Sequence, residues 1–337
     1  MGEYFPSVNS TLSANALLSE VLPVFRVAPA TSCRLLYIGV NDSYLVTTTD
    51  AKRYVLRVYR AGLRTLDNVL YELEALLHLQ SNGVPVSIPI QLENGEYVYS
   101  LQAAEAERYV VLFTHANGQE PKYADRAEAV QYGRTVARMH EASQDFKSVH
   151  SRSALDVEHL LFSSLKTIEP FLAGRPQDQE YLSNLSGRLV GLLEALPVTK
   201  LEKGFCHGDL HGRNANIDDN GTLTFYDFDC CGIGWRAYDV AVFRWSAILH
   251  GTEKDAWPAY LEGYRECRSL SDTDLSAVPL FVAVRHIWMM GLNTSIASFF
   301  GDSWVNSSYF DREIGFIRKY DAECLGGRKS GLTNRCS

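Results

Sequence analysis

Three polar residues in one short segment, His207, Asp209 and Asn214, have the types and spacing that phosphoryl transfer requires. The segment reads H-G-D-L-H-G-R-N, and Asp227 follows thirteen residues after Asn214. A carboxylate such as Asp209 can orient an attacking hydroxyl and accept its proton late in the reaction. An amide oxygen and a second carboxylate are hard ligands that suit Mg²⁺ better than zinc or copper. The pattern therefore predicts Asp209 as the base and Asn214 and Asp227 as metal ligands.

The residues around this segment support a joint role. Asn220-Gly221 predicts a hairpin turn between two short strands, which would bring Asn214 and Asp227 close together. We expect His207 to organise the loop through hydrogen bonds, and His211 lies where protein kinases carry a lysine near the γ-phosphate. Taken singly, each residue has an ordinary role as a loop, cap or turn residue. Their combination with the hairpin favours a catalytic site.

The N-terminal part of the chain reads as strands. Residues 34–40, 43–49 and 53–59 are rich in β-branched and aromatic residues, and turn residues separate them, which predicts an antiparallel meander. The first turn, G-V-N-D-S-Y, allows two interpretations. Its backbone N–H groups and the Ser43 hydroxyl could cap nucleotide phosphates, or it is an ordinary hairpin.

Arg57 stands in the middle of the third predicted strand, V-L-R-V-Y, where a cation needs a partner. The next segment repeats leucine and valine at helical spacing over 66–79 and carries Glu72 and Glu74. One of these glutamates would pair with Arg57 if the segment is a nucleotide-binding lobe. Otherwise Arg57 is a surface residue on an edge strand and both glutamates are solvated.

Two further strands are expected near 97–101 and 108–113, and the chain changes character at Thr114. Helical patterns then cover 124–143, 155–172, 178–196, 238–249, 256–268, 275–300 and 308–324. We expect an α+β protein with a lobe at 1–113, a mainly helical lobe at 114–325 and a disordered tail at 326–337. His140 reads as a packed helix-end histidine. Aromatic residues at 285–288 and 304–309 line either an acceptor pocket or the core.

The composition of the chain limits the kinds of partner that we expect it to bind. The chain has 337 residues, 46% hydrophobic and 21% charged, with a net charge of −8 and no basic block, which argues against non-specific binding to nucleic acid or anionic membrane. The acidic balance suits a cationic acceptor. No apolar run approaches a membrane span in length. The seven scattered cysteines form neither a disulfide framework nor a zinc pattern, so we expect reduced thiols in the cytoplasm. Nothing in the pattern specifies an oligomeric state.

Several motifs together resemble the aminoglycoside phosphotransferase, choline kinase and homoserine kinase superfamily. They are H-G-D-L-H-G-R-N at 207–214, D-F-D at 227–229, A-Y-D-V-A at 237–241, G-R-T-V-A-R-M-H at 133–140 and Y-V-L-R-V-Y-R at 54–60. The resemblance covers roughly residues 30–325. It implies a bilobal protein-kinase-like fold, with an antiparallel-sheet N-lobe, a mainly helical C-lobe and ATP between the lobes.

The resemblance also implies roles for individual residues. Ser43 would reach a phosphate, Glu72 would pair with Arg57, and Asp239 would brace the catalytic loop. The adenine hinge would consist of Leu112, Phe113, Thr114 and His115. The sequence departs from the family at Arg57, where many members carry lysine, and at the phosphate loop, which has one glycine.

Three functions compete. The first is an ATP- and Mg²⁺-dependent kinase for a hydroxyl of an aminoglycoside, amino alcohol or hydroxy amino acid. The second is a protein Ser/Thr kinase of the bacterial stress-response type, and the third is a nucleotide-binding pseudokinase that acts as an interaction module. Only about ten residues separate Asp227 from the next predicted helix, which favours a small acceptor. Intact Asp209, Asn214 and Asp227 argue against the pseudokinase.

Overall fold

The computed structural model describes residues 6–197 and 200–326, and the chain divides into two compact units. The first unit contains Met1–Glu120, Asp145–Arg152 and Ala215–Asp229. The second unit contains Pro121–Gln144, Ser153–Asn214 and Cys230–Ser337. Residues 327–337 of the predicted tail lie outside the described residues.

The first unit is built on a five-stranded antiparallel sheet in the order β1-β2-β3-β5-β4. Its strands are β1 (Ala30–Ile38), β2 (Asp42–Thr48), β3 (Arg53–Val58), β4 (Tyr99–Gln102) and β5 (Glu107–Thr114). Burial alternates along β2, so Tyr44 and Val46 face the core, where they meet Leu56 of β3. Helical turns over 14–24, beginning with α1 (Ala14–Ala16), add Leu17 and Val21 to the same core. The predicted meander is confirmed.

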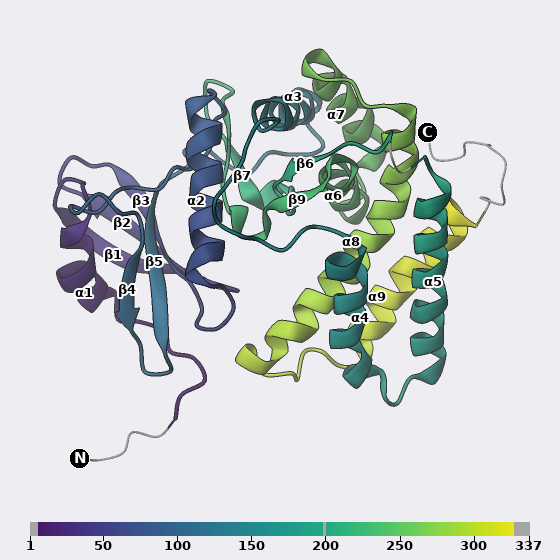
Figure 1. Cartoon of the computed structure of the whole chain (residues 1–337), viewed down its shortest axis with the longest axis horizontal. Helices are drawn as coiled ribbons and strands as arrows, with labels where there is room; N and C mark the ends of the chain where they lie inside the picture. Colours follow the sequence, from purple (N-terminus) through teal and green to yellow (C-terminus); the bar gives the residue numbers. More distant parts are fainter. Residues whose placement is uncertain (1–5, 198–199, 327–337) are drawn as a thin grey trace. The chain divides into compact units, whose positions relative to one another are not determined.

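Helix α2 (Leu66–Ser81) belongs to the first unit and runs beside the sheet (Figure 1). Thr65 caps its N-terminus, because its hydroxyl accepts from the N–H of Asn68 while the Asn68 side chain accepts from the N–H of Thr65. The chain leaves the helix at Gly83, whose φ of +74° favours glycine. The buried face of α2 includes one charged residue, Glu72, which is fully buried.

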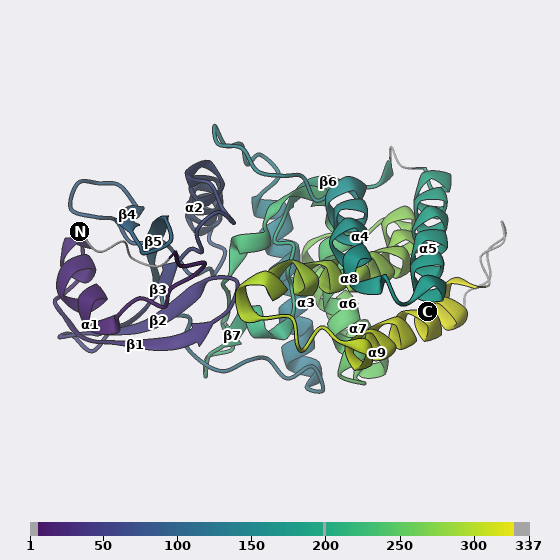
Figure 2. The same ribbon diagram turned by 90° about the horizontal axis from the view of Figure 1, so that it is seen from below.

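The second unit is mainly helical. Its helices are α3 (Arg126–Ala142), α4 (Ser163–Ile168), α5 (Pro176–Ala195), α6 (Arg236–Leu249), α7 (Glu253–Cys267), α8 (Asp272–Phe300) and α9 (Ser307–Tyr320). Helices α3 and α7 lie side by side (Figures 1 and 2). Their backbones approach closely at Gly133 and Gly263, where an added Cβ would overlap a carbonyl oxygen of the facing helix. This tight contact positions the helix that carries His140.

Two short strand pairs complete the fold of the described residues. In the first unit, β7 (Ala215–Ile217) and β8 (Leu223–Phe225) form the predicted hairpin, with Gly221 at a φ of +78° in the turn. In the second unit, β6 (Lys203–Cys206) pairs with β9 (Gly232–Trp235). The sequence pattern does not predict β6 and β9, because four-residue strands that include glycine carry little periodic signal. The predicted α+β class is confirmed.

The expectation that no segment reaches the length of a membrane span is wrong for α8. By length and composition α8 could cross a membrane, with a mean hydropathy of 1.5 in its most apolar window. However, 78% of that window is buried inside the protein, which is typical of a core helix. Helices α4 and α6 pack against α8.

Candidate active site

The segment 207–214 forms a loop that follows β6 in the second unit. Asp239, in the first turn of α6, accepts hydrogen bonds from the N–H groups of His207 and Gly208, both at 2.7 Å. Gly208 has a φ of +81°, and an added Cβ would overlap the carbonyl oxygen of Cys230. Only glycine fits at this position, so the loop backbone packs closely against Cys230. The hydrogen bonds to Asp239 hold the same part of the backbone.

Asp209 lies at the centre of this loop, and each of its carboxylate oxygens accepts a hydrogen bond from another side chain. The Nδ2 atom of Asn214 donates to the backbone oxygen of Asp209 at 2.9 Å and to Oδ2 at 3.0 Å. Arg285 of α8 donates to Oδ1. Burial alone would raise the pKa of Asp209, but Arg285 and His211 outweigh it and hold the pKa well below its usual range. The carboxylate is therefore ionised at neutral pH, and 17% of the side chain stays exposed.

The three histidines near the loop differ in what they contact. His207 is fully buried, and its Nδ1 accepts from the N–H of Asp209 at 3.2 Å, which fits the predicted role in organising the loop. His211 places its Nε2 3.4 Å from Oδ2 of Asp209. His140 is buried behind the loop, 3.2 Å from Asp239, and burial lowers the pKa of its ring. His140 therefore supports the residue that fixes the loop.

A second group of charged residues lies in the first unit around Arg57. Its guanidinium donates to Glu72 at 2.8 Å and to Asp227 at 3.0 Å, and Tyr59 donates its hydroxyl to the other oxygen of Glu72 at 2.9 Å. Of the two glutamates that could pair with Arg57, the structure selects Glu72. Glu74 instead accepts a hydrogen bond from the Ser148 hydroxyl. Although burial disfavours a charged guanidinium, Asp227 and Glu72 raise the pKa of Arg57 well above its usual value.

Asp227 has an unusual backbone conformation. Its φ of +61° is rare for a residue other than glycine, and its side chain remains 45% exposed. Two residues later, Arg64 binds the carboxylate of Asp229 at 2.9 Å, and Arg152 contacts the Asp229 backbone oxygen. Neither arginine was predicted from the sequence. They hold the segment that directly follows Asp227.

The remaining predicted nucleotide-binding residues lie on the sheet of the first unit. Ser43 lies in β2 opposite Arg57. The preceding turn is held by Arg60, which donates to the carbonyl oxygens of Gly39 at 2.7 Å and Val40 at 3.1 Å. The predicted hinge residues Leu112, Phe113 and Thr114 lie at the end of β5, and His115 follows. Their contacts with a nucleotide stay predictions.

Each of the two predicted metal ligands presents an oxygen of a type that suits a hard divalent cation. Because Asn214 turns its amide nitrogen toward Asp209, the amide oxygen is the atom left for a cation. Arg57 engages Oδ1 of Asp227, which leaves Oδ2 on a half-exposed side chain. An amide oxygen and a carboxylate oxygen are the ligand types that Mg²⁺ prefers.

The structure assembles the predicted site residues in two sets. The second unit brings together His207, Asp209, His211 and Asn214, and the first unit brings together Arg57, Glu72 and Asp227. The contact of Arg285 with Asp209 was not predicted from the sequence. A signal was present, because Arg285 is a single cation within the apolar run V-A-V-R-H-I-W and such a cation needs a partner.

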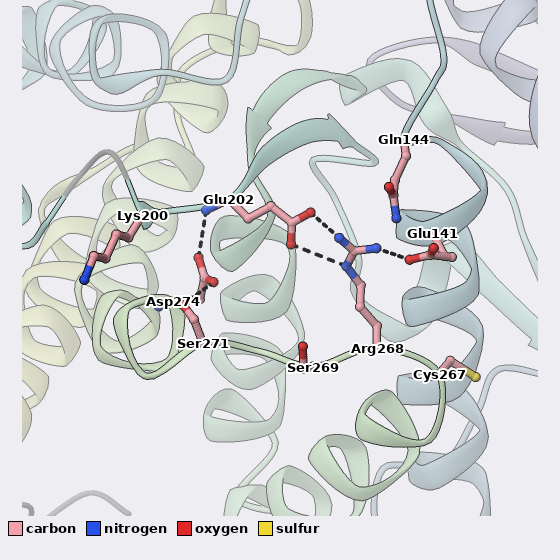
Figure 3. Close-up of a pocket in the computed structure, with 9 residues that line it drawn as sticks. All are labelled: Glu141, Gln144, Lys200, Glu202, Cys267, Arg268, Ser269, Ser271 and Asp274. Atoms are coloured by element: carbon pink, nitrogen blue, oxygen red, sulfur yellow. Dashed lines mark hydrogen bonds and ion pairs between the residues drawn. The ribbon is translucent and has the colours of Figure 1, made fainter.

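A polar pocket of 480 Å³ opens beside the start of β6 (Figure 3). Its lining residues are Glu141, Gln144, Lys200, Glu202, Cys267, Arg268, Ser269, Ser271 and Asp274. Arg268 bridges Glu141 and Glu202, and Asp274 accepts from the N–H of Glu202 at 3.1 Å. None of the described residues that line it is a predicted site residue. The ion pairs brace the segment that enters β6.

Comparisons with known proteins extend these observations. Residues 39–271 match the phosphotransferase enzyme family. The chain is 37% identical over 322 residues to an uncharacterized protein of Deinococcus radiodurans, covering 94% of this chain and 92% of that protein. It is 26% identical over 258 residues to the amicoumacin kinase of Bacillus subtilis, covering 72% and 74% of the two chains.

Solved structures show the same fold. An amicoumacin kinase in complex with AMP-PNP, Ca²⁺ and Ami is similar with a TM-score of 0.76 at 21% identity, covering 91% of this chain and 94% of that chain. A microcompartment-associated aminopropanol kinase has a TM-score of 0.71 at 25% identity, covering 92% and 96%. The predicted bilobal, protein-kinase-like fold is confirmed by these likenesses.

Proposed function

The chain belongs to the phosphotransferase enzyme family and is a kinase, and on this basis we propose that it transfers the γ-phosphate of ATP to a hydroxyl of a small molecule. One observation carries the proposal. The Asp209 carboxylate is ionised, partly exposed and in contact with the Asn214 amide. Asp239 holds the backbone of the loop that carries it. This arrangement suits a group that orients a hydroxyl for attack on phosphorus.

The proposed reaction forms a bond between the acceptor oxygen and the γ-phosphorus while the bond to the β,γ-bridging oxygen breaks and ADP leaves. The acceptor proton passes to Asp209 late in this step, which a weakly basic carboxylate can accommodate because the transition state is loose. We assign Asn214 and Asp227 as the ligands of Mg²⁺, which supplies charge neutralisation at the phosphate oxygens when bound. Arg57, held by Glu72, and Ser43 are assigned to the phosphates, and Leu112–His115 to the adenine.

The proposed acceptor carries both a hydroxyl and an amine. The named relatives include an aminopropanol kinase and homoserine kinases, and aminopropanol and homoserine both combine these two groups. The net charge of −8 is compatible with a cationic acceptor. In addition, eight residues including β9 lie between Asp227 and α6, which leaves little chain for a protein-substrate platform.

The test measures ADP release with Mg²⁺ and ATP against amino alcohols, aminoglycosides and hydroxy amino acids. Each acceptor is paired with an analogue that lacks the hydroxyl, such as 2-aminobutyrate for homoserine. We expect turnover with at least one hydroxyl compound, none with its analogue, and a phosphorylated product by mass spectrometry. Phosphate transfer to protein serine alone would favour the protein-kinase alternative. A melting temperature that MgATP does not raise would contradict the kinase proposal itself.

A further inference from the structure

Arg285 is a charged residue in the middle of the long core helix α8. Its side chain is fully buried, and its guanidinium contacts Oδ1 of Asp209 and donates to the carbonyl oxygen of Gly208 at 3.3 Å. A buried cation is costly unless a carboxylate compensates it, and packing alone would be served better by an apolar side chain. The contact with Asp209 is therefore the feature that accounts for a cation at this position.

Two tryptophan rings hold the guanidinium in place. The Cζ atom of Arg285 lies 4.5 Å from the ring centre of Trp288 and 5.0 Å from that of Trp245. Trp245 donates its Nε1–H to Nδ1 of His286 at 3.2 Å, and Nε2 of His286 lies 2.9 Å from the carbonyl oxygen of Glu313 on α9. Because burial keeps the His286 ring neutral, Nδ1 can accept while Nε2 donates. Residues of α6, α8 and α9 thus determine where the guanidinium lies.

The two oxygens of Asp209 have different neighbours as a result. Oδ1 is taken by Arg285, while Oδ2 lies 3.0 Å from Nδ2 of Asn214 and 3.4 Å from Nε2 of His211. Without Arg285, Asp209 would be held through Oδ2 alone, and its carboxylate could rotate. Because a buried cation also holds Oδ1, Oδ2 stays beside Asn214.

We propose that Arg285 is a positioning residue for phosphotransfer, which anchors Oδ1 of Asp209 so that Oδ2 alone meets the acceptor hydroxyl. This inference rests on the proposed function of Asp209. Arg285 acts through Asp209 and does not touch ATP or the acceptor. Its removal lowers the rate of the chemical step, because the carboxylate samples orientations in which no oxygen points at the hydroxyl.

The test compares the wild type with Arg285→Met, Asp209→Asn and the double variant. We expect Arg285→Met to lower kcat about 100-fold, with the KM values for ATP and acceptor within about threefold of the wild type. In the Asp209→Asn background, Arg285→Met should lower kcat no further, since the residue it positions is already inactive. Arg285→Lys should recover part of the loss, because it keeps the charge but not the planar fork. Millimolar guanidinium should raise kcat of Arg285→Ala and leave the wild type unchanged.

Two kinetic results would overturn the proposal. One is a loss in Arg285→Met that adds in full to the loss in Asp209→Asn. The other is an effect confined to the KM of the acceptor, which would place Arg285 in contact with it. Urea unfolding of the same four proteins gives a readout that needs no acceptor, and we expect the two substitutions to be strongly coupled. Additive effects on unfolding would refute the Arg285–Asp209 contact, whereas coupling without turnover of any acceptor would refute the proposed function and with it the role of Arg285.

Discussion

Strand β6 has a cluster of arginine and carboxylate groups at each end, and water reaches the two clusters very differently. At its start, Arg268 bridges Glu141 and Glu202, whose side chains are 57% and 31% exposed (Figure 3). Beyond its end, Arg285 is fully buried against Asp209. We call these the outer cluster (Glu141, Glu202, Arg268) and the inner cluster (Asp209, Asp239, Arg285).

Arginine–carboxylate pairs have different effects in the outer and inner clusters. In the outer cluster the carboxylates of Glu141 and Glu202 stay partly solvated without Arg268, although Arg268 itself is only 13% exposed, so an ion pair there changes stability less. In the inner cluster a lost partner leaves a charge with little water to replace it, so the groups depend on one another. We infer that the outer cluster guides the chain into β6, while the inner cluster determines the reactivity of the loop. The predictions below contrast the inner cluster and its surroundings with the outer cluster.

The largest effect is expected for Asp209→Asn, which keeps the shape of the side chain but removes its negative charge. Because an amide cannot accept the acceptor proton, kcat should fall about 1,000-fold. The control is Glu141→Gln, the same chemical change in the outer cluster, which should leave kcat within about twofold. ADP release at saturating substrates measures both. If Asp209→Asn kept a tenth of the wild-type kcat or more, the inner cluster would not contain the base.

The second prediction concerns stability. Asp239 is fully buried and accepts hydrogen bonds from the N–H groups of His207 and Gly208 and from His140. Asp239→Asn replaces the carboxylate with an amide, whose NH₂ group would face the N–H donors around it. We therefore expect a loss of about 4 kcal/mol in the free energy of unfolding. Glu141→Gln should change it by at most about 0.5 kcal/mol. Equal losses in urea unfolding would contradict the contrast between the clusters.

Much of the fold could be predicted because its elements are long and periodic. The β2–β3 meander and helices such as α2 and α8 each show a clear repeat of apolar residues over many positions. Strands β6 and β9 could not be predicted in this way, since each has four residues and their pairing joins segments that a window of sequence does not contain. Composition also could not distinguish a core helix from a membrane span for α8, because its burial depends on its neighbours.

The candidate site could be predicted where its chemistry lies close together in the chain. His207, Asp209, Asn214 and Asp227 fall within 21 residues, so their spacing is visible. The partner of Asp209 lies 76 residues further on, in a helix whose apolar pattern gives no reason to connect it with the loop. The choice between Glu72 and Glu74 likewise needed the structure, because it depends on which face of α2 is buried. Long-range pairing of buried charges is thus the part that sequence patterns did not supply.

The third prediction is a pH dependence that arises beside the inner cluster. Burial lowers the pKa of His286 from 6.5 to about 4, so between these values the unfolded chain binds a proton that the folded chain does not. Stability should therefore fall as pH decreases from 6.5 toward 4, by up to about 3 kcal/mol, and this term should be constant above pH 6.5. His286→Asn keeps an acceptor for Trp245 and should flatten this slope. Arg268→Gln, a change in the outer cluster, should leave the slope as it is; an unchanged slope in His286→Asn would assign the acid sensitivity elsewhere.

The smallest effect is expected for Arg268→Gln, which dismantles the outer cluster. Glu202 keeps a second cation, because Arg236 lies 3.2 Å from it, and Glu141 is exposed enough to be solvated alone. We therefore expect a loss below about 1 kcal/mol in the free energy of unfolding, smaller still in high salt, and a kcat within about twofold of the wild type. Urea unfolding at low and high salt, together with ADP release, measures these values. A tenfold loss of kcat at wild-type stability would show that the charges at the start of β6 reach the catalytic loop through the strand, and the two clusters would then have to be treated as one network.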